Sequence, residues 1–234
     1  MTQNTVVEVT ERIGLVLVEF QREWMDPEGK IHALFLDREQ YAASVQNAQR
    51  VVSAARAAGM AVIHVGLGFS PGHLELGQAR YGLRQAIAHH GTFPQHARGS
   101  EFMPPFVPQT GEFVVAGRTG ASAFAGSNLD SYLRNNRISR FYLMGYALHV
   151  CVESTLRAAH DLGYDTTLIA DACAAFSEQQ QQHVLQHVVH HFGARVDSAE
   201  FVRQTTGKEH SHDDLMALYL AYGDWLQESG GSSQ

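Results

Sequence analysis

The stretch "RFYLMGYALHVCVESTLRAAHDLGYDTTLIAD" runs from Arg140 to Asp171 and predicts how the chain folds. It begins and ends with short apolar runs, "RFYLMGY" and "DTTLIAD", which are typical of buried strands. Between them, apolar residues recur at helical spacing, and Gly163 ends the pattern. The recurring residues are Val152, Thr155, Leu156, Ala159 and Leu162. A strand, a helix and a second strand in this order indicate a parallel sheet with a right-handed crossover.

The same alternation continues on both sides of this stretch. Strands are predicted at "IGLVLVEF" (13–20), "MAVIHVG" (60–66) and "EFVVAG" (112–117), with an edge strand in "ARVDSAEFV" (194–202). We therefore expect one α/β domain over residues 1–234, with its core at 13–202 and a C-terminal helix and tail at 211–234. The predicted fold is a three-layer α/β/α structure around a mainly parallel sheet of about six strands.

The composition excludes several classes of protein. The 234 residues are 44% hydrophobic and 18% charged, with a formal net charge of −7, which does not favour nucleic acid or anionic membrane as a partner. Two cysteines cannot form a disulfide framework, and no apolar run is long enough to span a bilayer. The N-terminal residues do not resemble a secretion signal. We expect a cytoplasmic protein.

Reactive side chains gather where the predicted strands end, which is where parallel α/β folds bind their ligands. Glu19, His64 and Asp171 lie in or at the ends of strands, Arg118 follows another, and Cys151 opens a helix six residues after Gly145. A thiolate is a nucleophile, a helix N-terminus and a nearby cation lower the pKa of a thiol, and a carboxylate can take its proton. Two plainer interpretations remain: Cys151 as a small packing residue, and Glu19 with Arg118 as a structural ion pair.

The turn before Cys151 offers a place for developing negative charge. Backbone N–H groups between Gly145 and Cys151 can point into a pocket at the strand ends. Such groups could hold the oxyanion of a tetrahedral intermediate.

Several of these segments together resemble the isochorismatase-like cysteine hydrolases, which include nicotinamidases and N-carbamoylsarcosine amidohydrolases. The similarity covers residues 13–202. It is most specific in the pattern G-x-x-x-x-x-C-V-x-x-T, then A-x-x-x-G-Y, then D-A. This pattern comprises Gly145, Cys151, Val152, Thr155, Ala159, Gly163, Tyr164, Asp171 and Ala172. A second matching block is "SAFAGSNLD" (122–130).

The resemblance implies a catalytic triad of Glu19, Arg118 and Cys151. It also implies an oxyanion hole formed by the backbone N–H groups of Ala147 and Cys151, with a cis peptide bond between Tyr146 and Ala147. Two triad positions depart from the family pattern, because Glu19 stands where Asp is usual and Arg118 where Lys is usual. Arg keeps the positive charge but cannot readily carry a proton.

We predict neither a metal site nor a cofactor. Nicotinamidases in this superfamily hold a metal through an Asp and two His after the second strand, but here the region offers only His73. The helix that carries His183, His187, His190 and His191 could chelate a metal through pairs at i and i+4, yet a solvated polar face is the simpler interpretation. Cys173 is expected to be a packing residue.

Aromatic residues are expected to form the substrate pocket. Phe20, Trp24 and Tyr146 could make a wall for a flat or apolar acyl group, together with side chains of the irregular segment 67–111, and His149 could face the site as a second proton carrier. The resemblance also implies a homodimer or homotetramer.

Three functions remain open at this point. The first is hydrolysis of a C–N bond in a small amide or ureido compound through a Cys151 thioester. The second is a vinyl-ether hydrolase like isochorismatase, which does not need the cysteine. The third is a ligand-binding protein on the same scaffold that no longer catalyses.

Overall fold

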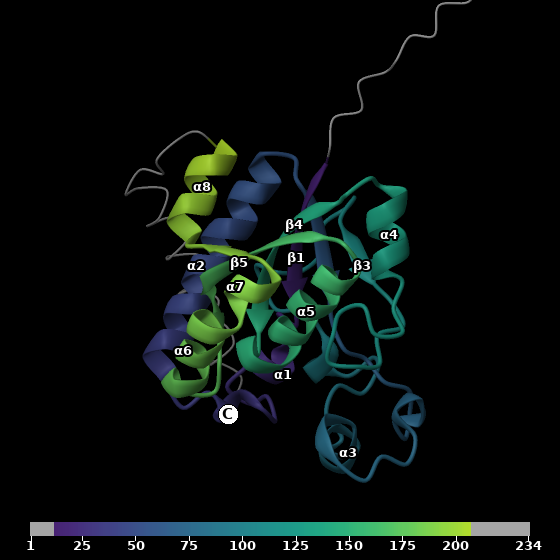
Figure 1. The fold of residues 1–234 in the computed structure, drawn as a ribbon. Coiled ribbons are helices and arrows are strands. Elements are labelled where there is room, and N and C mark those ends of the chain that lie inside the picture. The colour runs from purple at the N-terminus through teal and green to yellow at the C-terminus, as the bar shows by residue number, and fades with distance from the viewer. Residues whose placement is uncertain (1–11, 207–234) are drawn as a thin grey trace, which may run out of the picture.

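The computed structural model describes residues 12–206, which form one six-stranded sheet with helices on both faces (Figure 1). The strand order is β3-β2-β1-β4-β5-β6, and every neighbouring pair of strands is parallel. The predicted fold class, with its mainly parallel sheet of about six strands, is therefore confirmed.

The strands are β1 (Ile13–Val18), β2 (Ala61–Val65), β3 (Phe113–Val115), β4 (Arg140–Tyr146), β5 (Asp165–Ala174) and β6 (Ala194–Val196). The helices are α1 (Arg22–Met25), α2 (Arg38–Ala57), α3 (Gly82–His90), α4 (Leu129–Asn135), α5 (Glu153–Asp161), α6 (Glu178–His187), α7 (Val189–Phe192) and α8 (Ser198–Thr206). Short 3₁₀ turns occur at His32–Leu34, Leu74–Leu76 and Arg98–Ser100, and a π-helical turn at Leu148–Val152.

The two central strands, β1 and β4, carry the buried core of the sheet. Leu15, Val16, Leu17 and Val18 are fully buried, as a strand covered by helices on both faces requires. Where the two strands end, Val18 lies opposite Gly145. A Cβ atom at Gly145 would lie 2.1 Å from the Val18 carbonyl oxygen, and its φ is +134°, so only glycine fits here.

The helices divide between the two faces because the chain winds outward from β1 in both directions. The crossovers β1–α2–β2 and β4–α5–β5 run in opposite directions along the sheet, so right-handedness places α2 and α5 on opposite faces. Helix α8 packs beside α2, and α7 packs against α5. Figure 1 shows α4 and α5 together, away from α2 and α8.

The structure differs from the sequence prediction in two connecting segments. The predicted irregular segment 67–111 contains the helix α3, which projects from the body of the molecule in Figure 1. The predicted edge strand 194–202 stops at Val196, and residues from Ser198 form α8 instead. Asp197 explains this change, because its carboxylate accepts a hydrogen bond from the Glu200 amide in the first turn of that helix, and the Asp171 carboxylate accepts two more from the Ser198 amide and hydroxyl. The predicted C-terminal helix lies outside the described residues.

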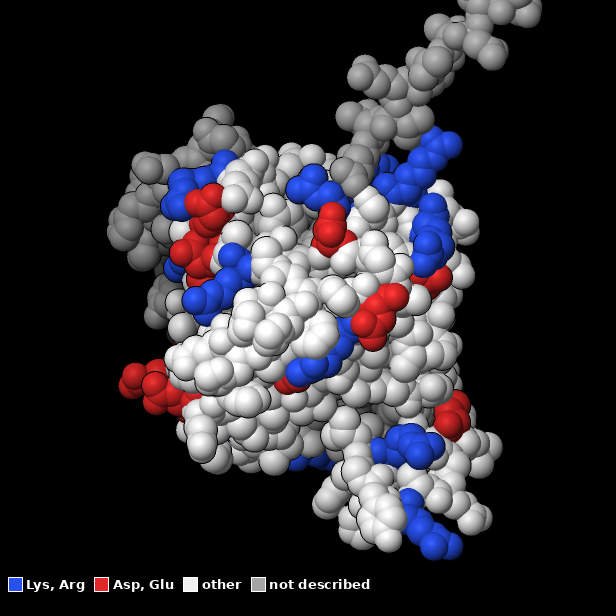
Figure 2. Space-filling model, viewed as in Figure 1, with Lys and Arg blue, Asp and Glu red and all other residues white. Residues whose placement is uncertain are grey.

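No helix among residues 12–206 has both the length and the apolar character needed to cross a membrane. The face of the molecule seen in Figure 2 carries Lys and Arg interspersed with Asp and Glu, rather than one block of a single sign.

Candidate active site

The candidate active site lies where the direction of winding reverses. Strands β1 and β4 are neighbours at this point, yet their connections leave toward opposite edges of the sheet. Open parallel sheets bind ligands at such a switch point, at the carboxyl ends of the strands. Glu19 follows β1 directly, and Cys151 lies in the π-helical turn after β4.

Glu19 is fully buried and held by two partners. Its Oε2 accepts a hydrogen bond from Trp24 Nε1 at 2.7 Å, and its Oε1 lies 2.7 Å from Arg118 Nη2 in an ion pair. Its φ is +58°, in a region that residues other than glycine rarely adopt. Backbone conformations of this kind cluster at functional sites, where the surrounding structure enforces them.

Arg118 is held in place by carbonyl groups of its own loop. Its Nε donates to the carbonyls of Gly120 (3.0 Å) and Ser122 (3.3 Å), and its Nη2 donates to the carbonyl of Ala121 (2.6 Å). A lysine ammonium could not reach three carbonyls and a carboxylate in one plane, whereas the guanidinium fork can. Burial acts to lower the pKa of Arg118, but Glu19 and Cys151 outweigh it and raise the pKa, so the side chain stays charged.

The Cys151 turn is fastened to the loop that carries Arg118. The Thr155 hydroxyl donates to the Cys151 carbonyl at 2.7 Å and accepts a hydrogen bond from the Ala123 amide at 2.9 Å. Thr155 is fully buried, so both bonds are shielded from water. The peptide bond between Tyr146 and Ala147 is cis, as the resemblance led us to expect.

The Cys151 thiol interacts with both other members of the predicted triad. Burial raises its pKa well above the ordinary value, and Glu19 raises it further through charge and hydrogen bonding, while Arg118 acts in the opposite direction. The sequence predicted a lowered pKa from the helix start and the cation alone. Burial above all, together with the carboxylate of Glu19 beside the thiol, reverses that prediction, so the raised pKa of Cys151 favours a neutral thiol in the resting protein.

A cavity of about 560 Å³ opens above these residues. Glu19, Cys151 and the loop Thr119–Ala121 border it, and its other walls are mostly apolar side chains from α3 and from the segments beside α1 and α6. The volume is typical of sites for drug-sized ligands, which are about 300–1,000 Å³.

Of the four side chains predicted to bind substrate, the structure places Trp24 in the cavity wall. Phe20 and Tyr146 are fully buried and do not border the cavity. Phe20 stacks on Phe106 at 4.2 Å, and the Tyr146 hydroxyl shares a hydrogen bond with Ser44. Both shape the core below the site rather than the ligand space.

His149 also lies outside the cavity wall, at the edge of the Phe176 ring, with 4.5 Å between the ring centroids. Burial lowers its pKa, and its Nδ1 has no hydrogen-bond partner among the described residues. His149 contacts Phe176, which borders the cavity, but His149 does not border the cavity itself. A direct role as a proton carrier is therefore not expected from this position.

Two further residues considered at the strand ends serve the framework. His64 Nε2 contacts Glu112 Oε2 at 2.7 Å, away from Cys151, and Asp171 caps α8 as described above. In the described part of the chain, no group of three or more His, Cys, Asp or Glu side chains is arranged to hold a metal ion.

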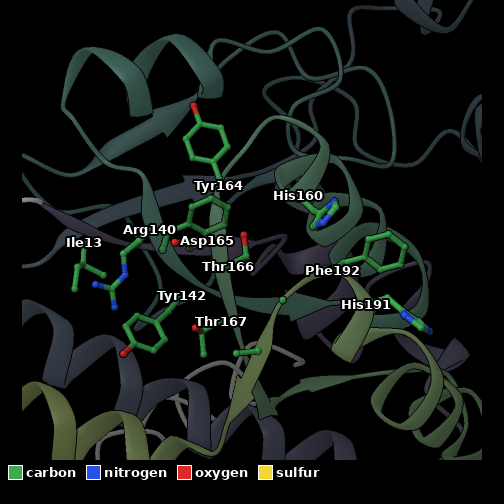
Figure 3. A pocket seen from close by; sticks show the side chains of 13 residues that line it. Ile13, Arg140, Tyr142, His160, Tyr164, Asp165, Thr166, Thr167, His191 and Phe192 are labelled. Carbon is green, nitrogen blue, oxygen red and sulfur yellow. The ribbon is translucent and has the colours of Figure 1, made fainter.

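A second hollow of about 500 Å³ lies at the opposite end of the strands, where β4, β5 and β6 begin. Figure 3 shows Tyr142, Tyr164, His160 and Arg140 around it. None of the predicted triad residues borders this hollow. The direction of the strands therefore separates two hollows of similar size, and Glu19 and Cys151 border the one at the carboxyl ends.

Two structural partners of the site were missed from the sequence. Trp24 was predicted to form part of the pocket but not to hold Glu19, because its spacing of five residues from Glu19 does not reveal where the indole N–H points. Gln21 was not considered. It is buried and connects the end of β1 to the loop after β2, donating to the carbonyls of Leu67 and Ser100 and accepting from the Leu67 amide.

Sequence comparison agrees with this geometry. The family model for the isochorismatase domain matches residues 14–200. An uncharacterised isochorismatase family protein, YwoC of Bacillus subtilis (strain 168), is 34% identical over 114 residues, which are 49% of this chain and 60% of that protein. The ureidoacrylate amidohydrolase RutB of Variovorax paradoxus (strain S110) is 31% identical over 170 residues, which are 68% of this chain and 67% of that protein.

Solved structures share the fold. A cysteine hydrolase from Pseudomonas syringae pv. phaseolicola 1448A superposes with a TM-score of 0.71 at 23% identity, covering 84% of this chain and 93% of that one. An N-carbamoylsarcosine amidase from Thermoplasma acidophilum superposes with a TM-score of 0.62 at 22% identity, covering 80% and 96%. Since the family model spans most of the sequence and the fold agrees, this chain belongs to the isochorismatase family, a family of hydrolases.

Proposed function

We propose that the protein hydrolyses the C–N bond of an amide or ureido compound through a thioester on Cys151. The observation that carries the proposal is the buried group of Glu19, Arg118 and Cys151 at the floor of the cavity. The names of two relatives, a ureidoacrylate amidohydrolase and an N-carbamoylsarcosine amidase, support the same bond type.

The first half of the reaction forms the thioester. Glu19 takes the thiol proton as Cys151 Sγ attacks the carbonyl carbon, and the carbonyl electron pair moves to oxygen. Backbone N–H groups of Ala147 and Cys151 hold that oxyanion. When the carbonyl re-forms, the C–N bond breaks, and the proton on Glu19 passes to the departing nitrogen, which leaves as ammonia or an amine.

The second half releases the acid. A water molecule attacks the thioester carbon while Glu19 takes one of its protons. The C–S bond then breaks, and that proton returns to the thiolate. The sum is one amide and one water converted to one carboxylic acid and one amine. Arg118 keeps its proton throughout and fixes the carboxylate, a role that suits its guanidinium better than proton transfer does.

The pairing in the site favours catalysis over a scaffold that only binds ligands. A structural ion pair of Glu19 and Arg118 would be complete without a thiol, yet Cys151 interacts with both charged groups and borders the cavity. A vinyl-ether hydrolase would use the acid alone and gives no reason for the thiol at this place.

The test is a screen of amides and ureido compounds with detection of released ammonia, followed by two variants on the best substrate. Cys151→Ala should abolish turnover, and Glu19→Gln should lower kcat by about 10² or more, the usual scale for lost acid–base catalysis. Mass spectrometry of the quenched wild-type reaction should find an acyl adduct on the peptide that contains Cys151. Full activity of Cys151→Ala would refute the thioester.

A further inference from the structure

We propose that the natural substrate carries a large apolar group, of phenyl size or more, on the amide or ureido unit that reaches Cys151, and that the far end of this group is neutral or anionic. This inference rests on the function proposed above and names the class of substrate. It follows from the volume, the walls and the charges of the cavity.

The volume is too large for a small polar substrate. A cavity of about 150 Å³ is enough to hold benzene, whereas the cavity above Cys151 measures about 560 Å³. An amide with only a few polar atoms beyond its carbonyl would leave most of this space to water. Water against apolar walls is unfavourable, so a ligand that displaces it gains affinity.

Most of the side chains in the walls are apolar. Trp24, Phe93 and Phe176 form one aromatic group, in which Trp24 lies 6.4 Å from Phe93 and 5.9 Å from Phe176 between ring centroids. Phe69 and Val150 continue the apolar surface. Pockets of this composition bind ligands mainly through buried apolar area and orient them with a few polar groups. Here the polar groups are those around Cys151.

Helix α3 gives a second reason, because its apolar side borders the cavity, and Ile87 alone among its apolar side chains also packs against the core. Leu83, Ala86 and Ile87 border the cavity, while no residue of α3 is buried. The end of the helix is fastened to the body by Lys30, whose Nζ donates to the carbonyls of His90 and Gly91. An apolar ligand in the cavity would bury these side chains of α3 and remove them from water.

The ionisable side chains that border the cavity are mostly basic. Among the described residues around it, Glu19 is the only acid, and Arg118 already pairs with it at the floor. Arg84, Lys30 and His90 border the cavity from the side of α3. Lys30 uses its ammonium group on two carbonyls, which leaves Arg84 as the exposed cation of the wall. A cationic group at the far end of the substrate would meet Arg84 and no acid.

Binding to the Cys151→Ala variant tests the inference separately from turnover. Isothermal titration with acetamide, hexanamide and 4-phenylbutanamide should show affinity rising about threefold to fourfold for each added methylene, since each buried methylene contributes a roughly constant gain. Hexanamide should therefore bind at least thirtyfold more tightly than acetamide. Equal or weaker binding of the longer amides would overturn the inference, leaving the apolar walls as a contact surface for a second copy of the chain.

Two matched variants on α3 show where the apolar group binds. Ala86 borders the cavity, whereas Ala88 is exposed and does not. In the Cys151→Ala background, Ala86→Trp should weaken 4-phenylbutanamide at least tenfold, and Ala88→Trp should change its Kd less than twofold. Leu34→Asp, on a side chain that is 43% exposed, should weaken it similarly without disturbing the core. Unchanged binding in both Ala86→Trp and Leu34→Asp would overturn the assignment to this cavity.

The charge preference is tested with 6-aminohexanamide and the monoamide of adipic acid. The cationic amide should bind at least tenfold more weakly than hexanamide, and the anionic one at least as tightly. Equal binding of the cationic amide would overturn this part of the inference.

Turnover by the wild-type protein is a separate measurement, and it tests the proposed function. If long amides bind tightly to Cys151→Ala while the wild type cleaves no amide, that result would contradict the hydrolase mechanism, but the inference of an apolar binding site would stand.

Discussion

The side chain of Trp24 both contacts Glu19, the proposed acid–base group, and borders the cavity. Its indole N–H holds Glu19 Oε2 at 2.7 Å, while its ring borders the ligand space. We predict that Trp24→Phe lowers kcat about tenfold, since a hydrogen bond to a charged group contributes roughly 1.5–3 kcal/mol and the lost bond orients the base. KM for an apolar amide should change less than threefold, because the aromatic wall remains.

The comparison variant for Trp24→Phe is Phe93→Leu, which alters the same aromatic group without touching Glu19. It should raise KM and spare kcat. Steady-state kinetics on one substrate distinguish the two effects. The opposite pattern, with kcat intact in Trp24→Phe, would mean that Arg118 alone is enough to orient the carboxylate.

Glu19 and Arg118 replace the usual Asp and Lys of the family as a pair, and the geometry explains why they should be coupled. The longer Glu19 arm reaches both Trp24 Nε1 and Arg118 Nη2 at 2.7 Å, and the guanidinium in turn fills its loop of carbonyls. Glu19→Asp should therefore lower kcat by about 10², because a shorter arm cannot keep both contacts. Adding Arg118→Lys should recover part of that loss, as residues in one network are not additive. Kinetic measurements on the four proteins of this cycle test the coupling, and strictly additive losses would show that the two sites act independently.

For single residues, the sequence predicted which side chains come together at the site better than it predicted what surrounds each of them. Glu19, Arg118 and Cys151 were predicted from a family pattern at the strand ends, and the structure brings the three side chains together, while their catalytic roles stay a prediction. The raised pKa of Cys151 was missed, since burial and the approach of a carboxylate depend on folding and not on neighbours in sequence. Phe20 and Tyr146 were predicted to face the ligand because they flank site residues, but both are fully buried and pack against each other in the core, with 5.1 Å between their ring centroids.

Among the elements, strands were predicted more reliably than connections. Buried strands such as β1 and β4 consist of apolar runs that have no other stable place. Helix α3 gave a weaker signal, because its apolar stripe faces a cavity and its other side is exposed, so few core positions mark its period. Helix α8 was read as strand although its N-terminal signal is local: the Asp197 carboxylate accepts a hydrogen bond from the Glu200 amide. The Asp171 carboxylate, which is distant in sequence, adds two hydrogen bonds from Ser198.

A partly buried polar cluster connects three elements at the edge of the sheet. Glu112, before β3, accepts hydrogen bonds from Arg56 at the end of α2 through Nε (2.7 Å) and Nη2 (3.0 Å). Its other partner is His64 on β2, at 2.7 Å. Although burial acts to raise the pKa of Glu112, these hydrogen bonds and the charge of Arg56 lower it from 4.5 to about 2. Burial lowers the pKa of His64, so this side chain is neutral at pH 7.

The sign of the pH effect follows from the depressed pKa of Glu112. A carboxylate with a folded pKa below its unfolded value stabilises the fold above pH 4.5, and this contribution is lost as the pH falls toward 2. Glu112→Gln should therefore lower the free energy of unfolding at pH 7 by about 2 kcal/mol. Its difference from wild type should shrink below pH 4.5. Urea unfolding over a pH series measures both, with the exposed Glu39→Gln as the control. A deficit that stays constant down to pH 3 would mean that packing, not charge, explains the loss.

At the scale of the whole molecule, the direction of the strands separates two hollows that differ in the side chains around them. The sheet has two hollows of similar volume, about 560 Å³ at the carboxyl ends of the strands and about 500 Å³ at the amino ends. Strand direction, which alternation in the sequence already predicts, places Glu19 and Cys151 at the first, with Arg118 paired to Glu19. The cavity walls could not be predicted in the same way, because they are assembled from segments as distant as α1, α3 and the start of α6.

The same architecture gives the two cysteines different access to solvent. Cys151 borders the cavity, whereas Cys173 is fully buried in β5, and burial raises its pKa to about 12. Iodoacetamide at pH 8 should therefore label Cys151 first, as peptide mass spectrometry can show, and both residues should react only after denaturation. Because burial and Glu19 raise the pKa of Cys151, its labelling rate should grow about tenfold for each pH unit between 7 and 9, following the thiolate fraction.

Glu19→Gln then separates two roles of the carboxylate that a loss of activity cannot distinguish. Removing its negative charge lowers the pKa of Cys151, so at pH 8 the thiolate fraction and the rate of labelling by iodoacetamide should rise. Turnover of an amide should fall in the same variant, because no group remains to take the thiol proton and deliver it to the departing nitrogen. Faster labelling with slower turnover is expected only if Glu19 acts as the base for a neutral thiol. Slower labelling in Glu19→Gln would instead mean that the carboxylate maintains a thiolate in the resting protein, and the proton transfer in the first half of the mechanism would have to be discarded.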